Sequence, residues 1–338
     1  MLQSIFFYFN VHFSIEYMKF INDFCRVQKY ICKLKFRKMK KITICLNIFF
    51  LIIIISTADA QNNGNNNLSV ENQLGLKSGA DPIKADPKRA GMTRKEGRPV
   101  VFTIGDSTVK NGKGDGSNGQ WGWGNYFWQL FDTTKVSVEN HALGGRSSRT
   151  FITEGLWNKV LAGVQKGDYV FIQFGHNDSG SFNTGTRPRA SLKGNGDNDT
   201  TVIMEATGKE EIIHTFGWYM RKYAQDVKAK GAIPVLLSHI PRNNFVTKDS
   251  LQIIRNDKGF GAWTKEAAKM EKVPYIELNG MVADKYEKMG KDSVQLMFHG
   301  DHTHTSRLGA ILNAQIIAEG ISASKDMKLK KLKKALKK

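Results

Sequence analysis

The sequence predicts an α/β fold in which a mainly parallel five-stranded sheet is covered by helices on both faces. Five short apolar runs are typical of buried strands, and segments with helical spacing of apolar residues separate them. Alternating strands and helices of this kind form parallel sheets with both faces covered. The 338 residues are 41% hydrophobic and 24% charged. This composition excludes a disordered, collagen-like or multi-span membrane chain.

The strands end at glycine or polar residues, and the helices fill the intervals between them. We expect strands at 99–104, 136–140, 168–174, 233–240 and 274–278. We expect helices at 124–132, 152–165, 210–230, 259–272 and 305–322. Residues 179–209 are polar and longer than an ordinary connection, and such loops are often functional.

The N-terminal region has the pattern of a targeting segment. Residues 42–55 are an apolar run that follows four basic residues and precedes an Ala-Asp-Ala ending at Ala60, the pattern of a secretory signal peptide. We expect translation to start at Met39, residues 1–38 to be an upstream extension, and cleavage after Ala60 to give a secreted or periplasmic protein. An uncleaved anchor is the alternative, although fourteen residues are short of the roughly 20 that span a bilayer.

The remaining chain divides into three parts. Residues 61–98 are rich in Asn, Gly, Lys and Pro and read as a linker, and residues 99–324 form the predicted domain. Residues 325–338 carry eight lysines with leucines at helical spacing. Such a tail could lie on an anionic membrane, but we favour a frayed, solvated extension of the last helix.

Charge and cysteine content narrow the function classes. The net charge is +19, and the two ends contribute more than their share. This suits an anionic partner, and nucleic acid is disfavoured because neither an aromatic-basic sheet motif nor a recognition helix is present. All three cysteines lie in the first 45 residues, so disulfides, cysteine-ligated metals and catalytic thiols are excluded after them.

Four polar clusters follow the predicted strands or precede the last helix. They are GDST at 105–108, ENHALGGRSSRTF at 139–151, QFGHND at 173–178 and DHTHTSRLGA at 301–310. Ligands of parallel α/β sheets bind beyond the carboxyl ends of the strands. Together the clusters make a strong signal for a site at that edge.

In these blocks the sequence resembles the SGNH, or GDSL-type, hydrolases, and most closely the rhamnogalacturonan acetylesterases. Ser107, Gly145, Asn177 and His304 match the four name-giving positions, and the resemblance spans about residues 99–322. It implies a three-layer α/β/α sandwich of flavodoxin-like type. It also implies removal of acetyl groups from the galacturonate of pectic backbones.

The chemistry of the residues agrees with this resemblance. Ser107 is the expected nucleophile, His304 the base that takes its proton, and Asp301 the group that orients the histidine. The backbone N–H groups of Ser107 and Gly145 and the side-chain amide of Asn177 would form the oxyanion hole. These groups perform both the nucleophilic and the electrostatic role, so we expect neither a metal nor a cofactor.

Each assignment has a simpler alternative. Ser107 could cap a helix, and Asp106 is expected to bind backbone amides around the turn. His299, His302 and His304 could bind a metal, but neither glutamate nor cysteine completes the set. Trp121 and Trp123 could stack on a sugar ring or belong to the core.

Four side chains near these blocks are candidates for binding substrate. Arg146 and Arg149 could pair with a galacturonate carboxylate, and internal salt bridges are an equal alternative. His302 is expected to be a neighbour in the cleft, whereas His176 could instead only shape its loop, as could Asp178. In the polar segment, Arg187 and Arg189 are further candidates for the carboxylate.

The sequence therefore predicts an exported, monomeric serine esterase that acts on acetylated, acidic plant polysaccharide. A xylan-type acetylesterase, a thioesterase or a lipase on the same fold is the first alternative, although the polar segment 179–209 argues against a lipase lid. A carbohydrate-binding protein without catalysis is the second, and the complete set of four name-giving residues argues against it.

Overall fold

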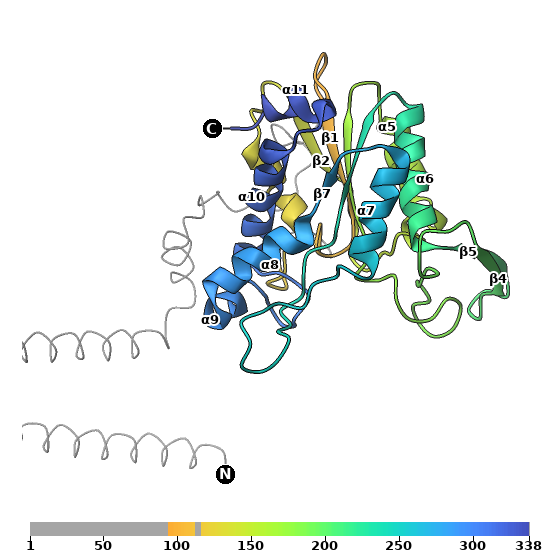
Figure 1. Cartoon of the computed structure of the whole chain (residues 1–338). Helices are drawn as coiled ribbons and strands as arrows, with labels where there is room; N and C mark the ends of the chain where they lie inside the picture. The colour runs from red at the N-terminus through yellow and green to blue at the C-terminus, as the bar shows by residue number, and fades with distance from the viewer. Residues whose placement is uncertain (1–93, 112–115, 338) are drawn as a thin grey trace, which may run out of the picture. The chain divides into compact units, whose positions relative to one another are not determined.

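The computed structural model describes residues 94–111 and 116–337, and its centre is a parallel sheet of five strands (Figure 1). Along the sheet the strands run in the order β2-β1-β3-β6-β7. Counted alone, this is the order 2-1-3-4-5 of flavodoxin-like folds, in which the direction of winding reverses between β1 and β3. Their bounds are β1 (Val100–Gly105), β2 (Ser137–Asn140), β3 (Tyr169–Gln173), β6 (Ile233–Leu237) and β7 (Tyr275–Ile276).

Helices cover both faces of the sheet, which confirms the three-layer α/β/α fold (Figure 1). Successive residues of a strand point to opposite faces, so each strand feeds two cores. Phe102 packs with the first set of helices and Val101 with the second. The first set is α4 (Thr150–Thr153), α5 (Leu156–Gly163), α6 (Phe216–Ala229) and α7 (Phe260–Glu271). The second set is η1 (Trp123–Asn125), η2 (Phe127–Leu130), α8 (Leu278–Met289) and α10 (Arg307–Ala323).

Two predicted helices are shorter or broken in the structure. The segment 124–132 forms the two 3₁₀ turns η1 and η2, in which the rings of Trp123 and Phe127 are fully buried and pack edge to face. Aromatic residues and glycine lower α-helix propensity, and this segment holds four aromatic residues and one glycine. The segment 152–165 is interrupted at Gly155, whose φ of 71° is left-handed and separates α4 from α5.

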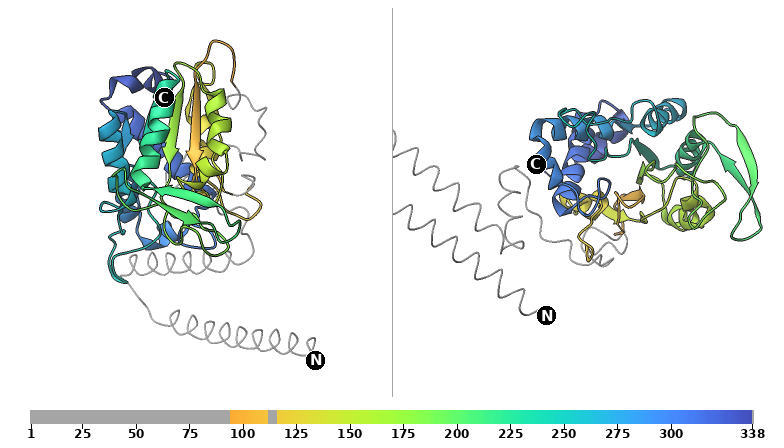
Figure 2. Two further views of the ribbon diagram at one scale, coloured as in Figure 1. Left: turned by 90° about the vertical axis from the view of Figure 1, so that its right-hand side faces the viewer. Right: turned by 90° about the horizontal axis from the view of Figure 1, so that it is seen from below.

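The predicted helix 210–230 begins late because its first residues form a hairpin. Strand β4 (Asp199–Ile203) pairs antiparallel with β5 (Glu210–His214), and α6 starts only after Thr215. The Thr215 side chain accepts a hydrogen bond from the backbone N–H of Trp218, which is an N-cap. The segment 179–209 is therefore partly ordered as a strand, and the hairpin projects from the body of the domain (Figure 2).

The helices predicted at 259–272 and 305–322 are confirmed as α7 and α10. Two further helices were not predicted, α8 and the short α9 (Lys291–Gln295). Before β1, the described end of the linker is anchored, because the Arg94 guanidinium pairs with the buried carboxylate of Asp168.

The interpretation of the lysine-rich tail as a frayed extension is wrong. Its residues form η3 (Met327–Leu329) and α11 (Lys330–Lys333), and Leu329 and Leu332 are fully buried. Asp326 caps this turn by accepting a hydrogen bond from the Lys328 backbone. The leucines join the core beside α10, so the tail is part of the domain.

In the part of the chain that the structure describes, no helix is long and apolar enough to cross a membrane. The predicted signal peptide at 42–55, the start at Met39 and cleavage after Ala60 lie outside the described residues.

Candidate active site

The four predicted clusters meet at the carboxyl edge of the sheet. Ser107 follows β1, Gly145 follows β2, Asn177 follows β3, and the loop 299–304 precedes α10. The first three strands are neighbours in the sheet, with β1 between the other two. The cluster thus lies at the point where the strand order reverses, which is where such sheets bind ligands.

Ser107, His304 and Asp301 form a hydrogen-bonded chain. The Ser107 hydroxyl lies 2.9 Å from His304 Nε2, and His304 Nδ1 lies 2.6 Å from Asp301 Oδ2. The other oxygen of Asp301 accepts from the backbone N–H groups of Thr303 and His304, at 2.7 and 2.8 Å. A chain of this kind, from a hydroxyl through an imidazole to a carboxylate, is an arrangement that can activate a serine.

The Asp301 carboxyl is ionised at neutral pH. Partial burial alone would raise its pKa, but hydrogen bonds from the His304 ring and from the backbone of His304 and Thr303 outweigh this and lower the pKa to about 2. An ionised carboxylate keeps the proton of the neutral imidazole on Nδ1. Nε2 is then free to accept the serine proton.

The nucleophile turn is held by buried hydrogen bonds. Asp106 accepts from the backbone N–H and the hydroxyl of Thr108, which confirms its structural role. That hydroxyl in turn accepts from Gln173 of β3, at 2.7 Å. Burial raises the pKa of Asp106, and the Thr108 hydrogen bonds partly offset the effect. Ser107 caps none of the described helices, so its side chain is available for chemistry.

Gly145 and Asn177 are the two further residues that the sequence predicts as oxyanion donors. Gly145 has a φ of 80°, and a Cβ atom there would lie 1.9 Å from the Arg187 guanidinium. The left-handed φ favours glycine, whereas the end of the flexible Arg187 side chain could move aside. The Asn177 amide donates to the Arg146 carbonyl at 3.0 Å and keeps a second N–H for a ligand.

Asp178 ties two segments of the site together. It accepts from the backbone N–H and the hydroxyl of Ser148 and from the hydroxyl of Ser191. Burial raises the pKa of Asp178 to about 7, although these hydrogen bonds act in the opposite direction. Asp178 therefore shapes the loop, as one reading of the sequence suggested.

The two arginines predicted to bind substrate are engaged inside the protein. Arg149 is fully buried, donates to the carbonyls of Phe182 and Pro188, and lies 3.5 Å from Glu211. The assignment of Arg149 as a substrate contact is therefore wrong. The reason is that the Ser148 to Phe151 turn directs this side chain under the polar segment.

Arg146 forms an internal salt bridge, which was the alternative to a substrate contact in the sequence analysis. Its guanidinium forms an ion pair with Glu154 at 2.9 Å and donates to the Gly144 carbonyl. About a third of the side chain remains exposed. Arg146 therefore connects Glu154 to the loop that carries Gly144 and Gly145.

The two candidate histidines differ in environment. His302 is exposed, and its carbonyl accepts from the Asn243 backbone. Burial, together with the nearby charges of Arg242 and His304, lowers the pKa of His176 to about 3. His176 is thus neutral at physiological pH, and its ring packs edge to face on that of His239 at 4.6 Å.

Sequence reasoning missed the polar segment 238–244. The strand predicted at 233–240 ends at Leu237, so residues 238–244 also lie at the carboxyl edge. They supply His239 and Arg242 to a 270 Å³ cavity beside His176. The signal was present, because a polar cluster follows this strand as it follows the other three.

The remaining candidates also have defined places. Trp121 and Trp123 are buried in the core, which settles the choice between core and sugar platform. Arg187 and Arg189 donate to the Gly145 carbonyl at 3.4 and 3.1 Å. Within the described ranges, no three His, Cys, Asp or Glu side chains, His299 included, form a metal-binding group.

Comparisons with known proteins agree with this geometry. The GDSL-like Lipase/Acylhydrolase family matches residues 103–310. The rhamnogalacturonan acetylesterase of Emericella nidulans is 30% identical over 67% of this chain and 85% of its own length. The rhamnogalacturonan acetylesterase RhgT of Bacillus subtilis is 30% identical over 66% of this chain and 90% of its own.

A solved structure gives the same result for the fold. The crystal structure of the Bacillus subtilis protein YxiM superposes with a TM-score of 0.53 at 26% identity. The match covers 67% of this chain and 56% of that one, so the present chain spans little more than half of it.

Proposed function

We propose that this chain, which belongs to the GDSL-like lipase/acylhydrolase family and is a carboxylic ester hydrolase, removes acetyl groups from rhamnogalacturonan or a related acidic pectin. The observation that carries the mechanism is the hydrogen-bonded chain from Ser107 through His304 to Asp301. The polysaccharide is supported by the names of two relatives at 30% identity.

In the first half of the reaction, the sugar acetate is cleaved. His304 takes the hydroxyl proton of Ser107 while the serine oxygen attacks the acetyl carbonyl carbon. The carbonyl oxygen becomes negative and binds the backbone N–H groups of Ser107 and Gly145 and the free N–H of Asn177. The tetrahedral intermediate collapses, His304 gives its proton to the sugar oxygen, and the deacetylated sugar leaves.

In the second half, the acetyl-serine is hydrolysed. A water molecule gives one proton to His304 and attacks the acetyl carbonyl, passing through the same oxyanion hole. Collapse of this intermediate returns the proton to Ser107 and releases acetate. The ionised Asp301 stabilises the imidazolium of His304 in both halves.

Cationic side chains around the site support an acidic substrate. Arg187 and Arg242 are exposed, and each donates to a backbone carbonyl of a site residue, Gly145 and His176 respectively. Arg189 is half-buried beside Arg187. The guanidinium group is the side chain best suited to bidentate pairing with a carboxylate, so these arginines are the groups that we expect to recognise a galacturonate.

Release of acetate from acetylated rhamnogalacturonan, acetyl-xylan and p-nitrophenyl acetate tests the proposal. We expect the acidic polymer to have the highest kcat/KM. Its KM should rise between about 0.1 and 1 M salt, where the Debye length falls from about 10 to about 3 Å. The KM of the neutral ester should stay constant. Faster hydrolysis of acetyl-xylan would contradict the proposal that the substrate is acidic, but it would be consistent with an esterase.

We further propose export through the signal peptide at 42–55, with cleavage after Ala60. Mass spectrometry of the protein from the culture medium should then give an N-terminus at Gln61. Recovery of the intact apolar segment in membranes would instead indicate an anchor.

We also propose that catalysis needs no metal ion, since the triad and three donors perform the required roles. Dialysis against EDTA should leave kcat unchanged. Loss of activity that zinc restores would contradict this.

A further inference from the structure

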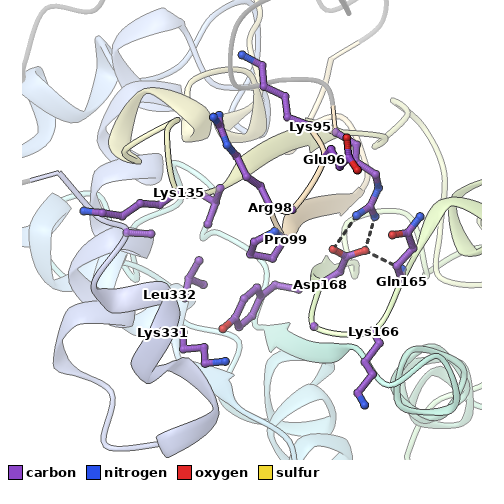
Figure 3. A pocket seen from close by; sticks show the side chains of 16 residues that line it. Lys95, Glu96, Arg98, Pro99, Lys135, Gln165, Lys166, Asp168, Lys331 and Leu332 are labelled. Atoms are coloured by element: carbon purple, nitrogen blue, oxygen red, sulfur yellow. Dashed lines mark hydrogen bonds and ion pairs between the residues drawn. The ribbon is translucent and has the colours of Figure 1, made fainter.

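A second pocket lies at the opposite end of the sheet from the catalytic residues. It has a volume of about 690 Å³ and is lined by the chain before β1, the turns before β2 and β3, and α11 (Figure 3). Strand β1 runs from this pocket to the nucleophile turn, and its six residues span about 20 Å. The pocket is therefore too far from Ser107 to belong to the catalytic site.

The lining combines an apolar floor with a basic rim. Pro99, Tyr169 and Leu332 contribute the floor, and Figure 3 shows basic side chains around Pro99 and Leu332. Six basic and two acidic residues line the pocket, and one of the acids, Asp168, is neutralised by Arg94. The basic residues are Arg94, Lys95, Arg98, Lys135, Lys166 and Lys331.

Three of these cations are available to a ligand. Lys95, Lys166 and Lys331 are exposed, and within the described residues none of them forms an ion pair. Lys135, by contrast, pairs with Asp132 at 2.9 Å. The preceding linker segment 61–93 carries four basic and three acidic residues, so its charge does not match the rim.

We propose that this pocket is a secondary binding site for an acidic oligosaccharide, which holds the polymer while the catalytic edge deacetylates it. A uronate sugar has carboxylates for the lysines and an apolar ring face that can lie on Pro99, the partly exposed residue of the floor. The choice of this ligand rests on the proposed function; the existence of a site for carboxylated ligands does not.

Two other polyanions fit less well. A membrane-binding helix needs an apolar face turned outward, whereas Leu329 and Leu332 of the tail are fully buried. Single-stranded nucleic acid needs exposed aromatic rings on which bases stack, and Tyr169, the aromatic residue of the lining, is only 2% exposed.

Calorimetric titration with a short, unacetylated oligogalacturonide tests the site, because this probe carries no scissile ester. The pocket variant replaces Lys95, Lys166 and Lys331 with glutamine. The control variant makes the same change at Lys159, Lys285 and Lys288, which are exposed and lie outside the pocket. Both variants lose three positive charges, so only the location of the charge differs.

We expect the pocket variant to bind about tenfold more weakly than wild type and the control variant to bind as wild type. The turnover of p-nitrophenyl acetate should be unchanged in both. On acetylated rhamnogalacturonan polymer, the pocket variant should show a raised KM with an unchanged kcat.

Equal binding by the pocket variant and wild type would overturn the site. So would equal weakening in both variants, or tighter binding of anionic phospholipid vesicles or single-stranded DNA than of the oligogalacturonide through the same lysines. Failure of the proposed function looks different: wild type would release no acetate from acetylated rhamnogalacturonan, whatever the pocket variant binds.

Discussion

The two ends of the sheet carry different kinds of polar chemistry. At the carboxyl edge, burial displaces the pKa values of Asp106, His176 and Asp178, and fixed hydrogen bonds hold the reactive groups. At the amino edge, the polar groups of the pocket are mainly exposed lysines around an apolar floor. Preorganised, desolvated groups suit bond making, whereas solvated cations suit long-range attraction of a polyanion.

The role of a charged side chain in this protein therefore depends on the end of the sheet at which it lies. Arginines near the catalytic edge are partly structural, as the buried Arg149 demonstrates. At the other end, the buried Leu332 packs α11 onto the core, and the neighbouring Lys331 keeps its ammonium group in water. Variants at the two ends should therefore fail in different measurements.

The largest expected effect is loss of the nucleophile. Ser107→Ala should lower kcat for p-nitrophenyl acetate by at least about 10⁴-fold, with an unchanged melting temperature. His304→Ala should lose nearly as much, and His302→Ala far less, because the His304 ring forms the hydrogen bond to Ser107. Near wild-type turnover in Ser107→Ala would contradict the assignment of Ser107 as nucleophile. A larger loss of kcat in His302→Ala than in His304→Ala would contradict the assignment of His304 as base. Binding of oligogalacturonide at the amino edge should survive all three changes.

The next effect concerns the oxyanion hole. Asn177→Ala should lower kcat about 10²–10³-fold, because one donor to the developing charge is lost. Asn183→Ala is a matched control, since the Asn183 side chain also donates to a backbone carbonyl at 3.0 Å but lies in the polar segment before the hairpin. A similar loss of kcat in both variants would mean that Asn177 acts only through its structural hydrogen bond.

The sequence was sufficient to predict the sheet and the meeting of Ser107, His304 and Asp301 at its carboxyl edge, because both depend on local signals. Apolar runs mark buried strands, and the polar residues that follow them must meet at one edge. It was not sufficient where tertiary packing overrides local preference. The hairpin at 199–214 depends on where Thr215 caps α6, and the burial of Leu332 depends on the space beside α10.

The direction of individual side chains was the other feature that the sequence did not predict. Whether Arg149 faces the cleft or the interior follows from the turn that carries it, and composition does not encode that direction. His239 and Arg242 were missed because the strand before them was predicted three residues too long. The first error concerns the direction of a side chain, and the second concerns the position of an element boundary.

A third prediction tests the amino edge as part of the fold. Leu332→Ala should lower the free energy of unfolding by about 2–5 kcal/mol, since it leaves a cavity in the core. Met327→Ala, in the same tail but 69% exposed, should change it by no more than about 0.5 kcal/mol. Urea denaturation measures both. Small effects of equal size would indicate that the tail is a solvated extension after all. They would also weaken the case for the pocket, because α11 lines it.

The smallest expected effect is a pH dependence at the carboxyl edge. Burial raises the pKa of Asp178 to about 7 in the folded protein, whereas the ordinary value is 3.8. The folded state therefore binds a proton more readily than the unfolded state. The stability that this proton contributes is fully present below pH 3.8 and is lost as the pH rises through 7.

The Asp178→Asn variant removes this titration and keeps the size of the side chain. The free energy of unfolding of wild type, relative to that of the variant, should thus fall as the pH rises from about 4 to about 7.5. Asp257→Asn, at an exposed position, should show no such trend. Other titrating groups are common to each pair of proteins, so the difference isolates Asp178. A constant difference across this range would mean that the carboxyl is ionised throughout, stabilised by its hydrogen bonds from Ser148 and Ser191, and that burial is the weaker influence at this edge.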